Sequence, residues 1–334
     1  MIYGIHKDKH PLETVRTIRK ILNELDISTS ERTWNQFSEN SFSVRLDDLT
    51  LDQVGTCGKG ISKEFSLASV YAEFLERLQT GSLYKWKFGL MDEVSFQYPD
   101  AKDISIEECL KHGADMGLTP EFAAVLSKGK DTIACLPFFD YFENCVRYFP
   151  VSVLYGGFSC TGMCSGNTPQ EAMIQGICEI FERYTSQLMF TDESLVFPSI
   201  PLNQIQSPEL SKMITFILNS GYGILIKDLT LGGRFPALAV VVTNKTMTKM
   251  KVSAGSFVTL EITLERCLTE IFQGLSENNF EASMTDIKFC NEFETIRYSS
   301  EKEQRLYERE RWRHNKSGRY PKEILYSGET VSED

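Results

Sequence analysis

Two stretches decide how this sequence is interpreted: Ala72-Glu73-Phe74-Leu75-Glu76-Arg77 and Cys178-Glu179-Ile180-Phe181-Glu182-Arg183. Each carries Glu-x-x-Glu-Arg on a strongly helical segment. Residues three apart lie on one face of a helix, so each copy presents two carboxylates beside an arginine. Carboxylate oxygens are hard ligands that suit Mg²⁺, and a guanidinium binds phosphate oxygens in a bidentate manner. The repeat therefore predicts a site for a metal-bound phosphate.

The composition predicts a globular protein with a sizeable core. The chain has 334 residues, of which 42% are hydrophobic, and this is ordinary for packed domains. Its formal net charge of −11 argues against a general affinity for nucleic acid or anionic membrane, because both need clustered basic residues. We expect neither as a partner.

The cysteines and the N-terminus indicate a cytoplasmic protein. Nine cysteines occur without a Cys-x-x-Cys motif or a histidine pair at ligand spacing, which favours reduced, mostly buried thiols. For Cys160 and Cys164, a metal pair or a thiol nucleophile is the alternative. The N-terminus lacks the apolar run of a signal peptide, and no segment approaches the ~18 apolar residues of a membrane span.

Periodicity predicts the order of the elements in the first half. Apolar residues at helical spacing predict a helix over residues 11–25, and alternation predicts a strand around 42–46. Gly58-Lys59-Gly60 predicts a turn that leads into a helix over 62–80, and taken alone its lysine is interpreted as a surface residue. A polar stretch over 96–130 predicts a surface insertion with short helices.

A second helix start follows a glycine-rich loop. Aromatic and β-branched residues predict a strand over 147–154 before that loop. Thr168 suits the N-cap position, Pro169 suits the first turn, and Glu171 is placed as in a capping box. A helix is therefore predicted to begin at Pro169 and to run to about residue 188. Further strands are predicted over 224–226 and 237–242, and a third helix over 260–274. The tail beyond residue 300 is predicted to be exposed.

The predicted second helix carries a polar stripe. Glu171, Gln175, Glu179 and Glu182 recur at i, i+4, i+8 and i+11 and share one face. Because the other faces are apolar, we expect the helix to be buried on most sides and the carboxylates to line an internal cleft. The alternative is a solvated face with Arg183 as a salt-bridge partner. The repeat favours the first interpretation, since two such helices could share cations.

The loop over 162–167 could bind phosphate. Its backbone N–H groups and the following helix N-terminus attract anions. It matches neither a P-loop nor a dinucleotide-binding fingerprint, so a tight turn with a cap is the alternative.

Taken together, the motifs resemble those of the YcaO-domain family. They are Gly58-Lys59-Gly60 with the first Glu-x-x-Glu-Arg, Ser165-Gly166-Asn167-Thr168 with the second, and Leu264-Glu265-Arg266 through Gln273, in the family's order. The sequence is most similar to the family's stand-alone group. The resemblance implies an α+β ATP-binding fold with internally repeated strand, loop and helix elements, forming a single domain over residues 1–334.

By the same resemblance, the cofactors are ATP and Mg²⁺. The metal ligands or their close neighbours would be Glu73, Glu76, Glu171, Glu179 and Glu182. The nucleotide or its phosphates would be bound by Lys7, Thr14, Arg77, Asn167, Arg183, Arg266 and Gln273. No side-chain nucleophile is required, so no catalytic residue is assigned.

The resemblance implies phosphorylation of a backbone amide oxygen after a nucleophile attacks the carbonyl of a peptide or protein substrate. The alternative is an accessory factor for β-methylthiolation of a ribosomal protein, which binds nucleotide and a partner modifying enzyme. A further alternative is an ATP-independent scaffold that holds a modifying enzyme near its substrate. A homodimer is considered as the assembly. Because the sequence ends at Asp334, we expect it to lack the family's final core strands and any C-terminal extension.

Overall fold

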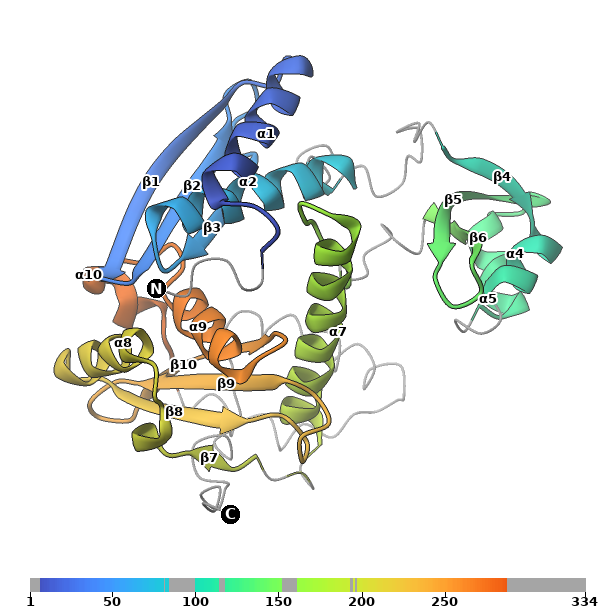
Figure 1. Cartoon of the computed structure of the whole chain (residues 1–334). Coiled ribbons are helices and arrows are strands. Elements are labelled where there is room, and N and C mark those ends of the chain that lie inside the picture. Colours follow the sequence, from blue (N-terminus) through green and yellow to red (C-terminus); the bar gives the residue numbers. More distant parts are fainter. Residues whose placement is uncertain are drawn as a thin grey trace. The chain divides into compact units, whose positions relative to one another are not determined.

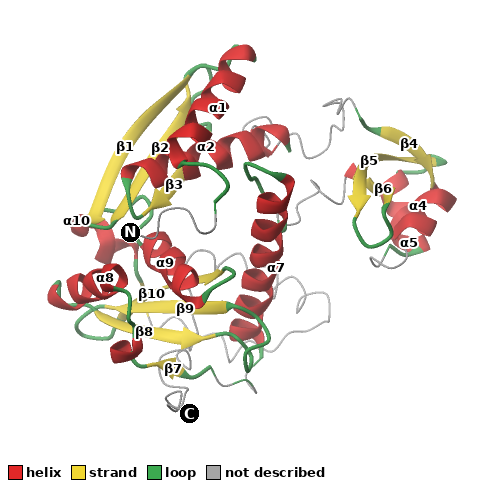
Figure 2. Cartoon of the chain, viewed as in Figure 1, coloured by secondary structure: helices red, strands yellow, loops and turns green. Residues whose placement is uncertain are grey.

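The computed structural model describes residues 7–80, 82–83, 100–113, 118–151, 161–192, 195 and 197–286. Helices and strands are mixed along these residues, as the sequence predicts (Figures 1 and 2). The chain divides into two compact units, Met1–Glu76 with Gly162–Asp334 (unit 1) and Arg77–Thr161 (unit 2). Unit 2 contains the segment expected to be an insertion. A single family domain over the whole chain stays a prediction.

The N-terminal half of unit 1 is an antiparallel sheet with two helices. The strand order is β1-β2-β3, and both pairings are antiparallel. Helix α1 begins after His10, whose Nδ1 accepts a hydrogen bond from the N–H of Leu12 at 3.3 Å. The elements are α1 (Pro11–Glu24), β1 (Thr29–Ser38), β2 (Ser41–Asp48), β3 (Gly55–Gly60) and α2 (Lys63–Gln79).

Gly58-Lys59-Gly60 is the end of strand β3, so the predicted turn is wrong. A Cβ atom at Gly58 would lie 2.3 Å from the Ser66 carbonyl oxygen and 2.4 Å from the Val70 nitrogen. Helix α2 therefore packs directly on the backbone of β3. Gly58 is needed here because α2 packs closely on β3, and not because the chain turns. Glycine serves both purposes, so the sequence alone does not distinguish them.

The second half of unit 1 is a five-stranded antiparallel sheet in the order β11-β10-β9-β8-β7. Its strands are β7 (Ser199–Ile200), β8 (Gly223–Asp228), β9 (Ala237–Thr243), β10 (Lys249–Ser256) and β11 (Thr285–Asp286). Its helices are α7 (Pro169–Thr191), α8 (Pro208–Asn219), α9 (Leu260–Ile271) and α10 (Glu277–Phe280), with short 3₁₀ helices η2 (Leu202–Gln204) and η3 (Glu281–Ser283).

Strand β9 lies at the centre of this sheet, and all its residues are buried. Val240 packs in a cluster with residues of α8 and α9, whereas Val241, on the opposite face, packs with Met189 near the end of α7. Helices thus cover both faces. This explains why the strand is a continuous apolar run and does not alternate.

Helix α9 joins the two sheets of unit 1 (Figure 1). It contacts β9 and β10 on one side and β2 and β3 on the other. Just beyond its end, the N–H of Gly274 donates to Ser43 Oγ at 3.0 Å, and the Phe272 ring stacks on Phe37 with centroids 3.7 Å apart. The polar face of α9 is therefore held beside strand β3.

Among its described residues, unit 2 has a small three-stranded sheet, β4-β5-β6, and the helices α4 and α5. Its elements are β4 (Lys102–Ser105), α4 (Ile106–Gly113), α5 (Pro120–Ser127), β5 (Thr132–Asp140) and β6 (Cys145–Pro150). Its core includes Cys109 and Cys135. The predicted strand over 147–154 corresponds to β6, although most of its second half lies outside the described residues, as do Cys160 and the tail beyond 300. No described helix combines the length and apolarity of a membrane span.

Candidate functional site

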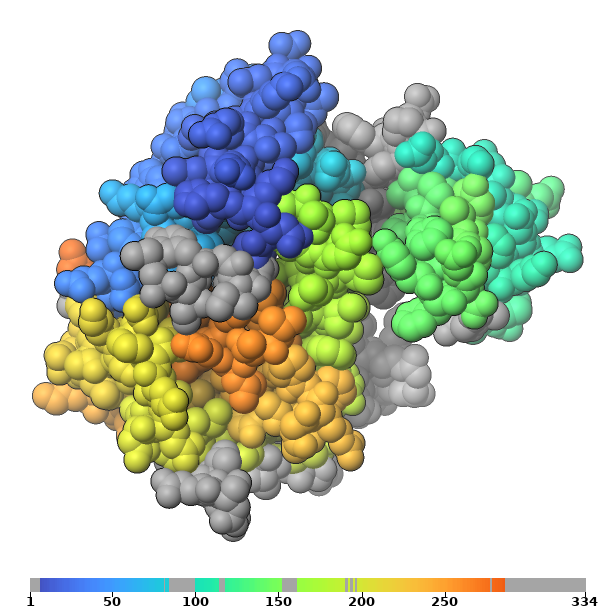
Figure 3. Space-filling view, viewed as in Figure 1, coloured from blue at the N-terminus to red at the C-terminus, as the bar shows by residue number. Residues whose placement is uncertain are grey.

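Four predicted site residues from distant parts of the chain meet at the start of α7. The carboxylate of Glu171 accepts hydrogen bonds from the Asn167 side chain at 3.0 Å and the Asp8 backbone at 3.2 Å, and it pairs with Lys7 Nζ at 3.1 Å. Thr14 Oγ1 donates to Asn167 Oδ1 at 2.8 Å. We call Lys7, Thr14, Asn167 and Glu171 the loop cluster; in Figure 3, α1 and the start of α7 lie side by side here.

Half of the predicted capping box is present. Thr168 Oγ1 accepts a hydrogen bond from the N–H of Glu171 at 3.2 Å, as an N-cap should. The reciprocal bond is missing because the Glu171 carboxylate accepts instead from the N–H of Asn167 at 3.3 Å. Burial raises the pKa of Glu171, but Asn167, Lys7 and Asp8 together outweigh it and lower that pKa. Ionised Glu171 thus holds Lys7, Asp8 and Asn167 together at the start of α7. Its role as a metal ligand stays a prediction.

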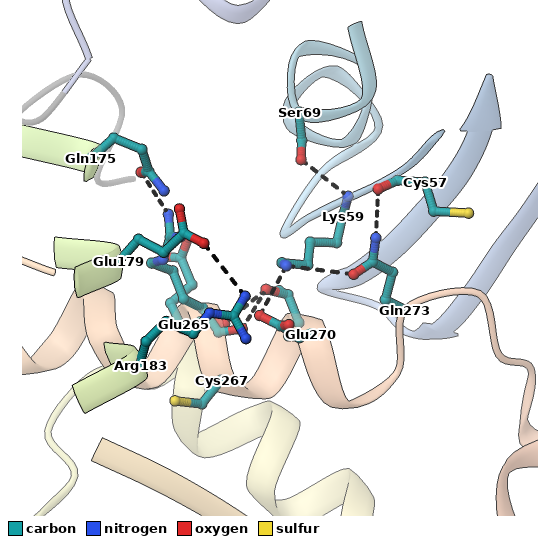
Figure 4. A network of polar contacts seen from close by, with 12 residues as sticks. Cys57, Lys59, Ser69, Gln175, Glu179, Arg183, Glu265, Cys267, Glu270 and Gln273 are labelled. Atoms are coloured by element: carbon teal, nitrogen blue, oxygen red, sulfur yellow. Dashed lines mark hydrogen bonds and ion pairs between the residues drawn. The ribbon is translucent and has the colours of Figure 1, made fainter. Parts of the chain in front are cut away.

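A second group of charged side chains lies between β3, α7 and α9 (Figure 4). We call it the central cluster. Five of the predicted site residues belong to it, together with two that were not assigned to the site. The members are Glu179, Glu182, Arg183, Arg266, Gln273, Lys59 and Glu270.

Lys59 is a member of the cluster, so its interpretation as a surface lysine is wrong. Its Nζ lies 2.9 Å from Glu270 Oε2 and 3.4 Å from Gln273 Oε1, and its side chain is 22% exposed. Gln273 in turn donates through Nε2 to the Cys57 carbonyl. Cys57 and Lys59 are two residues apart on β3, so they share one side of the strand and both reach α9.

The two arginines of the cluster have donors left over. Arg183 pairs with Glu179 at 3.5 Å, and Arg266 donates through Nη1 to Gln175 Oε1 at 3.1 Å. The guanidinium of Arg266 lies over the Phe257 ring, 5.5 Å from its centroid. Within the part of the chain that the structure describes, the Nε atoms of both arginines are buried without a hydrogen-bond partner. Such donors are rare in folded proteins and costly, so they point to a missing acceptor.

The carboxylates of the cluster are crowded. Burial and the nearby charge of Glu270 raise the pKa of Glu182 to about 7, and burial raises that of Glu179. Burial also disfavours ionised Glu270, but the ammonium of Lys59 and the charges of Arg266 and Arg183 together outweigh it, and the pKa of Glu270 is lowered. The cluster would gain from another cation. Within the described parts of the chain, however, no three Asp, Glu, His or Cys side chains are already arranged around a metal position.

The two Glu-x-x-Glu helices approach each other at Cys164. Burial raises the pKa of this thiol, and the charges of Glu76 on α2 and Glu179 on α7 raise it further. Carboxylates from both copies therefore lie within electrostatic range of one atom. Glu73 is half-buried on α2, and Arg77 is exposed and belongs to unit 2. The roles of Glu73 and Arg77 stay predictions.

The expectation that α7 is buried on most sides is wrong. Ile174, Ile177 and Ile180 are 43 to 49% exposed, whereas Glu171 and Glu182 are only 8 and 9% exposed. The helix is therefore turned with its charged stripe inward, toward the N-terminal segment and α9. An inward charged stripe is unusual for a structural helix and typical of a site.

The comparison with known proteins agrees with this geometry. The profile of the YcaO family, described as YcaO cyclodehydratase, ATP- and Mg²⁺-binding, matches residues 57–333. The chain belongs to the YcaO family. ATP and Mg²⁺ are thus the cofactors of its family, as the resemblance implies.

Two relatives of this YcaO chain match most of it. An uncharacterised protein of Haemophilus influenzae is 29% identical over 81% of the chain. The ribosomal protein S12 methylthiotransferase accessory factor YcaO of Escherichia coli is 28% identical over 80%. The chain covers 49% of each relative and so spans about half their length.

Two solved structures show the same fold. A heterocyclase in complex with substrate and cofactor superposes with a TM-score of 0.61 at 19% identity, over 79% of this chain and 40% of the other. YcaO from Methanopyrus kandleri, bound with AMPPCP and Mg²⁺, gives 0.57 at 14% identity, over 96% and 77%. The prediction of a YcaO-type α+β fold is confirmed.

Proposed function

We propose that this chain binds Mg²⁺ and ATP at the central cluster and uses them to activate a backbone amide of a peptide or protein. The observation that carries the proposal is the pair of buried, unpartnered Nε donors of Arg183 and Arg266 beside the crowded carboxylates of Glu179 and Glu182. Donors without acceptors need an anion, and crowded carboxylates need a cation. A metal-bound triphosphate supplies both.

The residues present fit this ligand. Arg183 and Arg266 would bind phosphate oxygens, and Gln273, which accepts from Lys59 Nζ at 3.4 Å, would bind beside them. Glu179 and Glu182 would hold the metal, with Glu76 approaching from α2. The loop cluster would bind the rest of the nucleotide, since Asn167 and Thr14 lie at the N-terminus of α7. Glu73, Glu171 and Arg77 complete the proposed set.

The protein's contribution to catalysis would be position and charge. When bound, ATP supplies the phosphoryl group that makes the amide oxygen a leaving group. The arginines stabilise negative charge as it develops, and they are held in place by Glu179, Gln175 and the Phe257 ring. Without the metal, the pKa of Glu182 is raised to about 7, so a metal bound by this carboxylate would displace a proton near neutral pH.

A second candidate is an accessory factor for β-methylthiolation of a ribosomal protein. It is favoured by the 28% identity to the accessory factor of Escherichia coli. In this case the same pocket would bind nucleotide, and a partner enzyme would carry out the modification. A cytoplasmic location and a homodimer belong to either proposal as predictions.

Calorimetric titration of the purified chain with ATP, with and without Mg²⁺, tests the proposal. We expect binding that Mg²⁺ strengthens at least tenfold, and a loss of about 100-fold in the Glu76→Ala/Glu182→Ala variant, roughly 3 kcal/mol for two charged ligands. Glu24→Ala/Glu64→Ala makes the same charge change on the exposed side of α1 and on α2 and should bind normally. If the cluster variant keeps its affinity, the carboxylates are structural and the proposal is wrong.

Release of phosphate in the presence of a peptide separates the two candidate functions. An activating enzyme should release phosphate with peptide turnover. An accessory factor should bind nucleotide and a partner protein without releasing phosphate.

A further inference from the structure

Lys59 is the cation of the central cluster that pairs directly with Glu270, beside the guanidinium groups of Arg183 and Arg266. Its ammonium lies 2.9 Å from Glu270, and Glu270 raises the pKa of the buried Glu182 across the cluster. The Glu270 side chain is 39% exposed, so it lines accessible space and is not sealed in the core. A single ammonium thus stabilises a carboxylate that faces the same space as the proposed metal ligands.

An ammonium and a divalent metal compete for such a carboxylate. Both are attracted to the same oxygen atoms, and each repels the other at short range. Lys59 lies on strand β3, and its ammonium is at the end of a flexible four-carbon side chain. Its partners Glu270 and Gln273 lie on the face of α9. The side chain can therefore move away while the strand stays in place.

We propose that Lys59 is the counter-ion of the metal-free cluster and that a divalent metal displaces its ammonium from Glu270. This inference rests on the proposed function in one respect, that the cluster binds a divalent metal. Lys59 is then a positioning residue. It keeps Glu270 and Gln273 in place before the metal arrives, and it lowers the metal's affinity by occupying Glu270.

Removal of the ammonium should strengthen metal binding and weaken the metal-free fold. The probe is Mn²⁺ alone, which takes the same oxygen ligands as Mg²⁺ and whose free concentration is measured by electron paramagnetic resonance. We expect Lys59→Met to bind Mn²⁺ about tenfold more tightly than the wild type. In chelator, its thermal midpoint should fall by on the order of 3 °C, because Glu270 loses its partner.

Two further variants control for charge. Lys59→Arg keeps the cation and should behave like the wild type in both measurements. Lys63→Met removes a lysine from the exposed start of α2, where its Nζ lies 5.8 Å from the Trp34 ring centroid, and should leave Mn²⁺ affinity unchanged.

The outcomes separate this inference from the proposed function. If the wild type binds Mn²⁺ and Lys59→Met binds it equally or more weakly, Lys59 is not a competing counter-ion and only this inference is overturned. If neither protein binds Mn²⁺ while both are folded, no metal displaces the ammonium and this inference is overturned, whereas the Mg²⁺-dependent titration with ATP decides the proposed function separately.

A different observation, in unit 2, carries a second inference. The Sγ atoms of Cys109 on α4 and Cys135 on β5 lie 3.1 Å apart, and both residues are fully buried. The thiols are 26 positions apart in the sequence and meet in the core of unit 2. Burial raises the pKa of both, so they react slowly as isolated thiols.

We infer that Cys109 and Cys135 are a disulfide-forming pair that oxidises as a unit. A small, uncharged oxidant such as hydrogen peroxide can reach them during local opening. Peroxide oxidises the Cys109 thiol to a sulfenic acid and releases water. The Cys135 sulfur then attacks Cys109 Sγ, forming the S–S bond and releasing a second water, so that two thiols and one peroxide give one disulfide and two waters.

Peroxide treatment of the full chain, followed by alkylation and peptide mass spectrometry, tests this. The exposed Cys145 shows that the oxidant has acted. We expect a Cys109–Cys135 linked peptide lacking two hydrogens, and a higher thermal midpoint that dithiothreitol reverses. Cys135→Ser should give neither. Recovery of both thiols in reduced form after Cys145 has been consumed would overturn the inference.

Discussion

Arg266→Met is expected to weaken Mg²⁺-dependent ATP binding by about 100-fold, the equivalent of losing a charge-assisted, bidentate contact of roughly 3 kcal/mol. Arg266 has a buried Nε without a partner, and its Nη1 donates to Gln175 at 3.1 Å. The aromatic ring of Phe257 holds the guanidinium in place, so the free donor is already oriented. Calorimetric titration with ATP in excess Mg²⁺ measures the loss.

Two matched variants show whether the loss is specific. Arg266→Lys keeps the charge but not the planar fork, so it should recover only part of the affinity. Arg19→Met removes an arginine of the same unit that is bound to Glu31 and Tyr71, outside both clusters, and should bind ATP normally. Wild-type affinity in a folded Arg266→Met variant would show that this arginine does not contact the nucleotide.

The helices of this fold could be predicted because their signals are local. The predicted helices over 11–25, 62–80 and 260–274 correspond to α1, α2 and α9, and the start of α7 at Pro169 was indicated by its cap. Helical periodicity and a capping residue act over a few positions and are little affected by the rest of the protein. Both copies of the Glu-x-x-Glu repeat lie on predicted helices, α2 and α7.

The strands, and the contacts between residues of the site, depend on residues far apart in the sequence and have weaker local signals. Strand β1 was not predicted, and it contains irregular register and few buried residues. Lys59 and Glu270 are 211 positions apart, and nothing near either residue indicates the pair. The available signal was the spacing of Arg266, Glu270 and Gln273 at i, i+4 and i+7, which puts Glu270 on the same face as two predicted ligands.

Some errors had a definite physical origin. Gly58 resembled a turn glycine, although its role is to let α2 approach β3. The apolar residues of α7 suggested burial, but the helix turns its charged stripe inward and leaves Ile177 exposed. In both cases a residue type has two common uses, and only the packing of a distant element decides between them.

The stability of the metal-free protein is expected to fall as the pH rises from about 4.5 to 7. In the unfolded chain Glu182 ionises near its ordinary value of 4.5, whereas in the fold its pKa is raised to about 7. The folded state therefore binds the extra proton in this window, so the stabilisation is complete below 4.5 and is lost as the pH passes 7. The cost to the free energy of unfolding is on the order of 3 kcal/mol. Glu182→Gln should remove the part of this dependence that comes from Glu182, as measured by denaturant unfolding in chelator.

Glu265→Gln is the matched control for this prediction. Burial also raises the pKa of Glu265 to about 7, but the charges that raise it further are Glu261 and Glu209, not those of the central cluster. Each variant should therefore remove part of the same pH dependence.

Mg²⁺ distinguishes the two carboxylates. At pH 7, metal binding should ionise Glu182 and release a proton, which calorimetry in buffers of different ionisation enthalpy detects. Glu265→Gln should keep this proton release and Glu182→Gln should lose it. Equal proton release from both variants would place the metal elsewhere. Loss in Glu182→Gln alone would mean that the raised pKa reflects a carboxylate held in a metal site without its metal.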